Sequence, residues 1–158
     1  MASFTISSNL EFTLQVLDRV PEQGLVDDGP IGMNSDMGLV QLAFRQTLGD
    51  QAWIDKEIMV VADTLLIWVN SVEEMVEEGK HQHSGWDSLA TPHCLLYVCR
   101  QGSAYNFFAG LSAGYLTDSG GDWEANVGSF WMVDGETLLR FAHALRAELD
   151  AVTNIANR

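Results

Sequence analysis

Residues 123–152 read WEANVGSFWMVDGETLLRFAHALRAELDAV and contain the change of hydrophobic period that decides the fold. Apolar side chains alternate over 123–133, which is typical of a half-buried strand. From Asp134 the apolar residues recur at helical spacing, which predicts an amphipathic helix over 134–152. Its apolar stripe consists of Leu138, Phe141, Ala142, Leu145, Leu149 and Val152. Asp134 is placed to cap this helix, because its carboxylate can accept hydrogen bonds from the free N–H groups of the first turn.

The same succession of strand and helix occurs earlier in the chain. Alternating apolar residues over 39–48 predict a strand, and the residues over 52–61 predict its partner, with a helix beginning at Asp55 as the alternative. A second amphipathic helix is predicted over 63–78, with Asp63 as its N-cap. Gly79 follows directly and is suited to end this helix.

The other strands are predicted over 11–18, 93–100 and 104–115, with 3–7 as a short strand or a lead-in. Segment 93–100 is apolar on both faces, which favours a central strand. Strands grouped around single helices indicate an α+β fold. We expect one domain over 1–158, with an antiparallel sheet of about five to six strands and the two main helices packed on one face.

The composition limits the possible functions. The chain has 158 residues, of which 47% are hydrophobic, so it is not a wholly disordered chain. Eight Lys and Arg against 22 Asp and Glu give a formal net charge of −14. A protein with this charge repels phosphate backbones, so we expect no nucleic-acid partner.

No targeting or membrane segment is predicted. The N-terminal residues 1–14 have neither a basic residue nor a continuous apolar run, so they do not resemble a secretory signal. The most apolar stretch, 58–69, is too short for a bilayer span of about 20 residues. Cys94 and Cys99 are five residues apart, which places them on opposite faces of one strand and favours two free, half-buried thiols. These features predict a cytoplasmic protein.

Two acidic segments are candidates for binding a basic protein partner. The segment 21–38 is predicted to be a long loop with four acids and no basic residue. The acids are Glu22, Asp27, Asp28 and Asp36. The end of the first helix carries Glu73, Glu74, Glu77 and Glu78. These glutamates oppose the helix dipole, so recognition is one explanation and a solvated acidic face is the other.

Trp86 lies in the predicted polar loop 80–92, between Gly85 and Asp87. An exposed tryptophan on a loop can anchor a partner. The alternative is that its ring fills the edge of the core.

Other patterns indicate no catalytic residue, cofactor or metal. His81 and His83 could share a metal with Glu77 or Glu78, but no second cluster of ligands follows, so we expect both histidines to face solvent. The acids of 118–124 could bind Ca²⁺, but the two glycines there favour a hairpin turn. Residues 110–114 match G-x-S-x-G only by letter, because Ser112 lies within a predicted strand.

The layout of strand 123–133 before helix 134–152, and of strands 39–61 before helix 63–78, resembles the small, acidic, single-domain immunity proteins of bacterial polymorphic or contact-dependent toxin systems. The resemblance implies a protein that binds and blocks a cognate toxin domain, often a basic nuclease, and that is not an enzyme. It assigns no functional residue. A DNA mimic and a small enzyme that uses His81 and His83 are the alternatives, and the oligomeric state is left open.

Overall fold

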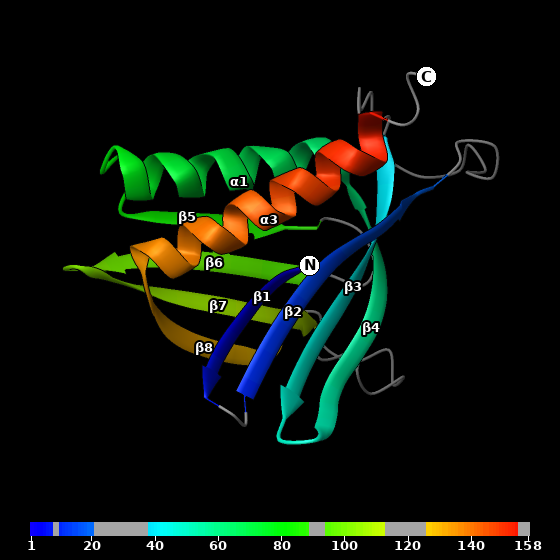
Figure 1. Ribbon diagram of the computed structural model, residues 1–158, viewed down its shortest axis with the longest axis horizontal. Helices are drawn as coiled ribbons and strands as arrows, with labels where there is room; N and C mark the ends of the chain where they lie inside the picture. Colours follow the sequence, from blue (N-terminus) through cyan, green and yellow to red (C-terminus); the bar gives the residue numbers. More distant parts are fainter. Residues whose placement is uncertain (8–9, 21–37, 89–93, 113–125, 155–158) are drawn as a thin grey trace.

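The computed structural model describes residues 1–7, 10–20, 38–88, 94–112 and 126–154, which form two sheets and two helices (Figure 1). The first sheet has the order β1-β2-β3-β4 and the second β5-β6-β7-β8, with every pair antiparallel. The strands of the first sheet are β1 (Ala2–Ser7), β2 (Leu10–Arg19), β3 (Leu39–Leu48) and β4 (Gln51–Val61). Those of the second are β5 (His83–Asp87), β6 (Cys94–Gln101), β7 (Ala104–Ser112) and β8 (Asn126–Asp134). The helices are α1 (Ala62–Glu77) and α3 (Gly135–Asn154).

The predicted α+β class, antiparallel pairing and two amphipathic helices are confirmed. The prediction of one sheet with five to six strands is wrong. The described strands form two sheets of four strands each. One reason is that His83–Asp87, predicted as part of a polar loop, is a strand whose inward side chains are Ser84 and Trp86. The other reason is α1, which separates the chain into two groups of four successive strands, each pairing with its sequence neighbours.

The two sheets pack on each other through an aromatic cluster. The ring of Phe12 from β2 lies 5.6 Å from that of Phe107 and 5.3 Å from that of Trp131, both of the second sheet. Phe141 of α3 closes the cluster at 5.8 Å from Phe12. Aromatic pairs at these separations stabilise a core beyond the area that they bury.

A buried polar side chain also joins the sheets. Gln46 of β3 is fully buried, donates a hydrogen bond to the carbonyl of Ala109 at 2.8 Å, and accepts one from the hydroxyl of Ser129 at 3.0 Å. The sequence pattern predicts Leu48 on this face, but the pairing of β3 with β4 shifts after Gln46 and Leu48 is exposed.

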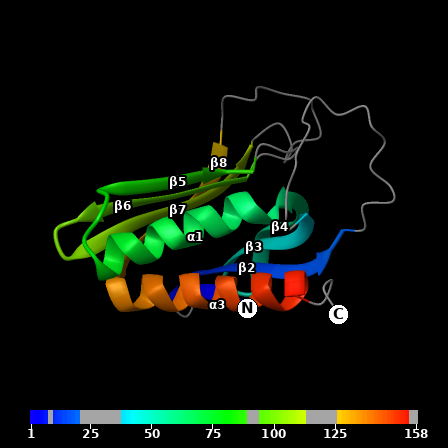
Figure 2. The same cartoon turned by 90° about the horizontal axis from the view of Figure 1, so that it is seen from above.

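Both helices lie on the inner side of the second sheet (Figure 2). Helix α1 packs against β5 and α3, while α3 packs against β1 and β2. The predicted cap of α3 is confirmed, because the backbone N–H of Thr137 donates to the Asp134 carboxylate at 2.7 Å. This hydrogen bond holds the pKa of Asp134 below its ordinary value. Neither helix of the described chain has the apolar length that a membrane span requires.

The predicted N-cap of α1 is wrong. The N-cap is Val61, and Asp63 lies within the first turn. Strand β4 continues directly into the helix, and the backbone N–H of Ala62 donates to the carbonyl of Gly38 at 3.0 Å. A backbone partner therefore satisfies this N–H group without a side-chain cap.

Candidate binding surfaces

Glu73, the first glutamate of the α1 acidic cluster, is turned into the protein. Its two oxygens accept hydrogen bonds from Arg146 of α3, at 3.0 Å for Nε and 2.5 Å for Nη2. The side chain is 17% exposed, and the carboxylate raises the pKa of Arg146. Neither of the two explanations offered by the sequence, recognition or a solvated acidic face, applies to Glu73, which ties the two helices together.

The other glutamates of the cluster lie on the surface. The Lys80 ammonium lies 2.6 Å from Glu78 and 4.0 Å from Glu74, and these two carboxylates raise the pKa of Lys80. Gly79 ends the helix with a φ of 68°, as predicted, and the chain then brings Lys80 back to the helix end. Glu77 is exposed and has no partner within the described ranges. The surface charge here is negative but partly neutralised by its own lysine.

Trp86 is buried, which contradicts its prediction as an exposed anchor. Its side chain is 5% exposed, and its indole N–H donates to the hydroxyl of Thr64 in the first turn of α1 at 3.0 Å. The structure agrees with the alternative, in which the ring fills the edge of the core between β5 and α1.

Asp27, Asp28 and Asp36 lie outside the described residues, as do the acids of 118–124. The strand ends that flank these segments are described. Gly38 bonds to Ala62 at the start of α1, and Trp86 near the end of β5 bonds to Thr64 in the same turn. The antiparallel order of the second sheet places the end of β7 and the start of β8 at the same end as the end of β5.

Segment 21–37 is thus attached near the N-terminus of α1, and segment 113–125 is attached at the corresponding end of the second sheet. They contain seven acidic residues and no Lys or Arg. The acids are Glu22, Asp27, Asp28, Asp36, Asp118, Asp122 and Glu124. The start of α1, where segment 21–37 is attached, is about 22 Å along the helix from its terminal glutamates.

In the described part of the chain, His, Cys, Asp and Glu side chains form no cluster of three or more that could hold a metal ion. His81 and His83 are exposed, as predicted, with His81 3.5 Å from Glu74 and the His83 ring stacked on Tyr97. Both cysteines are free; Cys99 is half-buried, but Cys94 is fully buried, and this burial raises the pKa of its thiol. Of the segment 110–114, residues 110–112 are the last residues of β7 and 113–114 lie outside the described residues, so the interpretation of the G-x-S-x-G match as a coincidence stays a prediction.

The outer face of the second sheet carries a row of apolar side chains, of which Phe130 and Met132 are the most exposed. Tyr97, Phe108 and Phe130 are paired in register across β6, β7 and β8. Phe130 is 72% exposed, and its ring lies 4.6 Å from that of Phe108. Met132, 67% exposed, extends the surface along β8. We call Tyr97, Phe108, Phe130 and Met132 the aromatic face.

Glycines shape the aromatic face. A Cβ atom on Gly85 would lie 3.4 Å from Cδ2 of Tyr97, so this ring covers the bare backbone of the neighbouring strand. A Cβ atom on Gly110 would lie 2.7 Å from Cζ of Phe108, so only glycine leaves room for that ring. The rings of Tyr97 and Phe108 therefore cover these glycines, while the ring of Phe130 is tilted by 43° against that of Phe108. One sequence pattern could have revealed this outward face: Phe130 and Met132 alternate along β8 with Trp131 and Val133, which are buried.

No protein-family model matches the chain, and no match was found among curated proteins. A similar solved structure is described as "CdiA-CT/CdiI toxin and immunity complex from Enterobacter cloacae". The similarity has a TM-score of 0.40 and 12% identity, and it covers 86% of this chain and 99% of that chain. A likeness this remote does not establish a shared function.

Proposed function

We propose that this chain is an inhibitor of the immunity-protein type, which binds a basic toxin domain and blocks it without any enzymatic activity of its own. The observation that carries the proposal is the charge of −14 together with its distribution. A strongly negative surface attracts a cationic partner and accelerates its association. The free thiols fit a reducing compartment, so we place this activity in the bacterial cytoplasm.

The acidic surface of this proposal has two parts. One is segment 21–37, attached near the start of α1, with Asp27, Asp28 and Asp36 as the contact residues. The other is the exposed end of α1, with Glu74, Glu77 and Glu78. Glu73 does not belong to this surface, because its carboxylate is held by Arg146. Trp86 does not belong to it either, because its ring is buried.

The alternatives are less well supported. A DNA mimic needs carboxylates in a row at phosphate spacing, whereas Lys80 interrupts the acidic group at the end of α1. An enzyme that uses His81 and His83 needs further groups around them. Within the described residues, His81 has the Glu74 carboxylate nearby and His83 stacks on Tyr97. This arrangement lacks a nucleophile activated by a base.

The test uses the product of the reading frame next to that of this chain. Expressed alone, that product should arrest growth, and expressed with this chain it should not. The two purified proteins should form a stable complex in which the activity of the toxin domain is lost. If the neighbouring product neither arrests growth nor binds this chain, the proposed function is wrong.

Two matched double variants test the acidic surface. Asp27→Lys with Asp28→Lys changes the predicted contact segment, and Glu11→Lys with Asp50→Lys changes exposed positions at the other end of the first sheet. Each pair shifts the net charge from −14 to −10. The first pair should slow association roughly three- to tenfold, and the second should have a smaller effect. Equal effects would mean that only the total charge matters.

A further inference from the structure

The aromatic face has the features of the centre of a protein interface. Its rings come from three adjacent strands and are aligned by pairing across the sheet, and those of Tyr97 and Phe108 lie over glycines. Exposed apolar clusters of this kind are uncommon on monomeric proteins and mark sites of interaction. Aromatic residues and methionine are enriched in the centres of interfaces, where they contribute most of the affinity.

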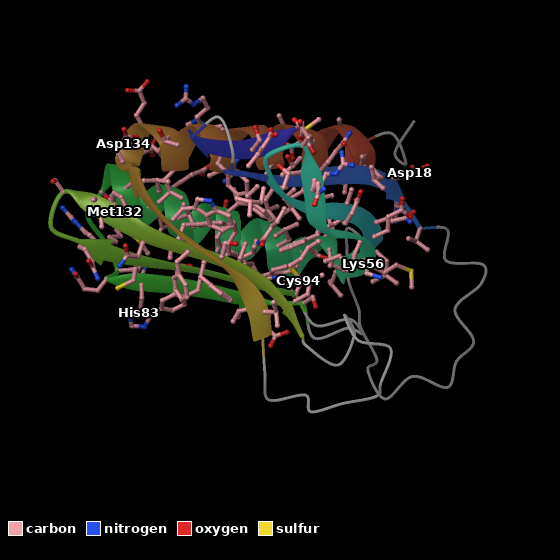
Figure 3. The ribbon with its side chains drawn as sticks, turned by 90° about the horizontal axis from the view of Figure 1, so that it is seen from below. Asp18, Lys56, His83, Cys94, Met132 and Asp134 are labelled. Atoms are coloured by element: carbon pink, nitrogen blue, oxygen red, sulfur yellow. The ribbon has the colours of Figure 1, made fainter. Side chains whose placement is uncertain are left out.

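No other described helix or strand covers this face. Figure 2 shows the second sheet with both helices and the first sheet on one side of it. Figure 3 shows the molecule from below, with His83 on the side of the second sheet away from the helices, and Met132 shares this face because it is paired with His83 through Cys99 and Asn106. The side chains of Phe130 and Met132 are therefore open to a partner from outside.

The charge around the face indicates what that partner is. The outward positions of β5 to β8 hold no Lys or Arg, whereas the acids Asp87 and Asp134 lie at opposite ends of the sheet. An apolar centre with an acidic border is complementary to an apolar surface bordered by Lys and Arg.

The same charges argue against two other occupants. Single-stranded nucleic acid stacks its bases on aromatic sheet faces, but it also needs Lys and Arg to hold its phosphates. A second copy of this chain would also carry a charge of −14, and the acidic borders would repel each other.

We propose that the aromatic face is the surface that holds the basic toxin domain, while the acidic segments guide that domain to it. This proposal rests on the proposed function and names the contact that supplies its affinity. Fast association then comes from charge, and slow dissociation comes from burial of Phe130, Met132 and the rings beside them.

The experiment measures binding of the neighbouring product by Phe130→Ser and Met132→Ser variants. The matched control is Ile67→Ser on α1, because Ile67 is 66% exposed and lies on a different surface. Loss of the Phe130 ring should weaken binding about 30-fold, mainly through faster dissociation, and Ile67→Ser should change it less than about twofold. Unchanged melting temperatures confirm that each variant folds.

Cys99 provides a second readout on the same face. It is paired with Asn106 beside Tyr97, it is half-buried, and Cys94 is too deeply buried to react. Binding of the toxin domain should slow labelling of Cys99 by a maleimide. A complex that forms equally well with Phe130→Ser and Met132→Ser, and leaves Cys99 labelling unchanged, overturns the aromatic-face proposal while the proposed function stands. Absence of any complex overturns both.

Two measurements on the chain alone test the other occupants. Sedimentation at about 100 μM should show a monomer, and a labelled oligothymidine should not bind, because both occupants would be repelled. A dimer that Phe130→Ser dissociates would assign the face to a second copy. Oligothymidine binding that Phe130→Ser abolishes would assign it to nucleic acid. Either result overturns the proposal.

Discussion

Replacing Glu73 with alanine tests whether one acid of α1 serves structure and not recognition. The change removes two hydrogen bonds from Arg146, at 3.0 and 2.5 Å, and breaks the ionic tie between α1 and α3. An exposed ion pair contributes about 0–1 kcal/mol. Breaking a buried pair costs about 3–5 kcal/mol, because one charge is left without its partner in the interior.

The Glu73–Arg146 pair lies between these limits. The side chain of Glu73 is 17% exposed and that of Arg146 is 32% exposed, so the freed guanidinium can reach water. Arg146 also keeps a contact with the side chain of Asn70. We therefore expect Glu73→Ala to lower the free energy of unfolding by about 2 kcal/mol, between those limits. For a chain of this length, that is a fall of about 4–8 °C in the melting temperature.

Glu77→Ala is the matched control, one turn further along the same helix. Glu77 is exposed and has no partner in the described part of the chain, so its removal should change stability by less than about 0.5 kcal/mol. Urea unfolding followed by tryptophan fluorescence measures both variants. A double-mutant cycle with Arg146→Met should give a coupling of about 1–2 kcal/mol. Equal stabilities of Glu73→Ala and Glu77→Ala would refute the structural role of Glu73.

Three further predictions concern the core, the α3 cap and the thiols. Gln46→Leu removes both hydrogen bonds between the sheets and should destabilise the fold by about 1–3 kcal/mol in urea unfolding, whereas Ser129→Ala, which removes one of them, should cost less. Asp134→Ala should lower the melting temperature at neutral pH. Because folding lowers the pKa of Asp134 from its ordinary 3.8, this difference should disappear as the pH falls below that value, and a difference that persists there would contradict the cap. Mass spectrometry of the native chain should show one maleimide, on Cys99, and a second on Cys94 only after unfolding.

Local periodicity accounts for the parts of the fold that could be predicted. The helix predicted over 134–152 is observed over Gly135–Asn154, because its apolar stripe and the Asp134 cap are both encoded within a few residues. The strand predicted over 39–48 is observed with the same bounds. Each strand pairs with its sequence neighbours, but the division into two sheets depends on packing between residues distant in sequence, such as Phe12 and Phe107, which periodicity does not show.

The candidate site was harder to predict for the same reason. Exposure of Glu73 and Trp86 depends on Arg146 and Thr64, which are distant in sequence and become neighbours only in the fold. In the sequence, β6 carries apolar residues on both sides, and one of them, Tyr97, belongs to the aromatic face. This pattern did not reveal the face, because it is also typical of a strand covered on both faces. Only the arrangement of the layers shows that the outer side of Phe130 is uncovered.

The association rate of this chain with the purified neighbouring product is the most direct test of the central claim, that a negative surface recruits a basic toxin domain. Stopped-flow fluorescence can follow this rate between about 50 and about 500 mM NaCl, a range over which surface charges become strongly screened. We predict an association rate constant of about 10⁸ M⁻¹s⁻¹ or more at low salt, which falls at least about tenfold over this range. An association rate that does not change with salt, or the absence of any association, would contradict the account.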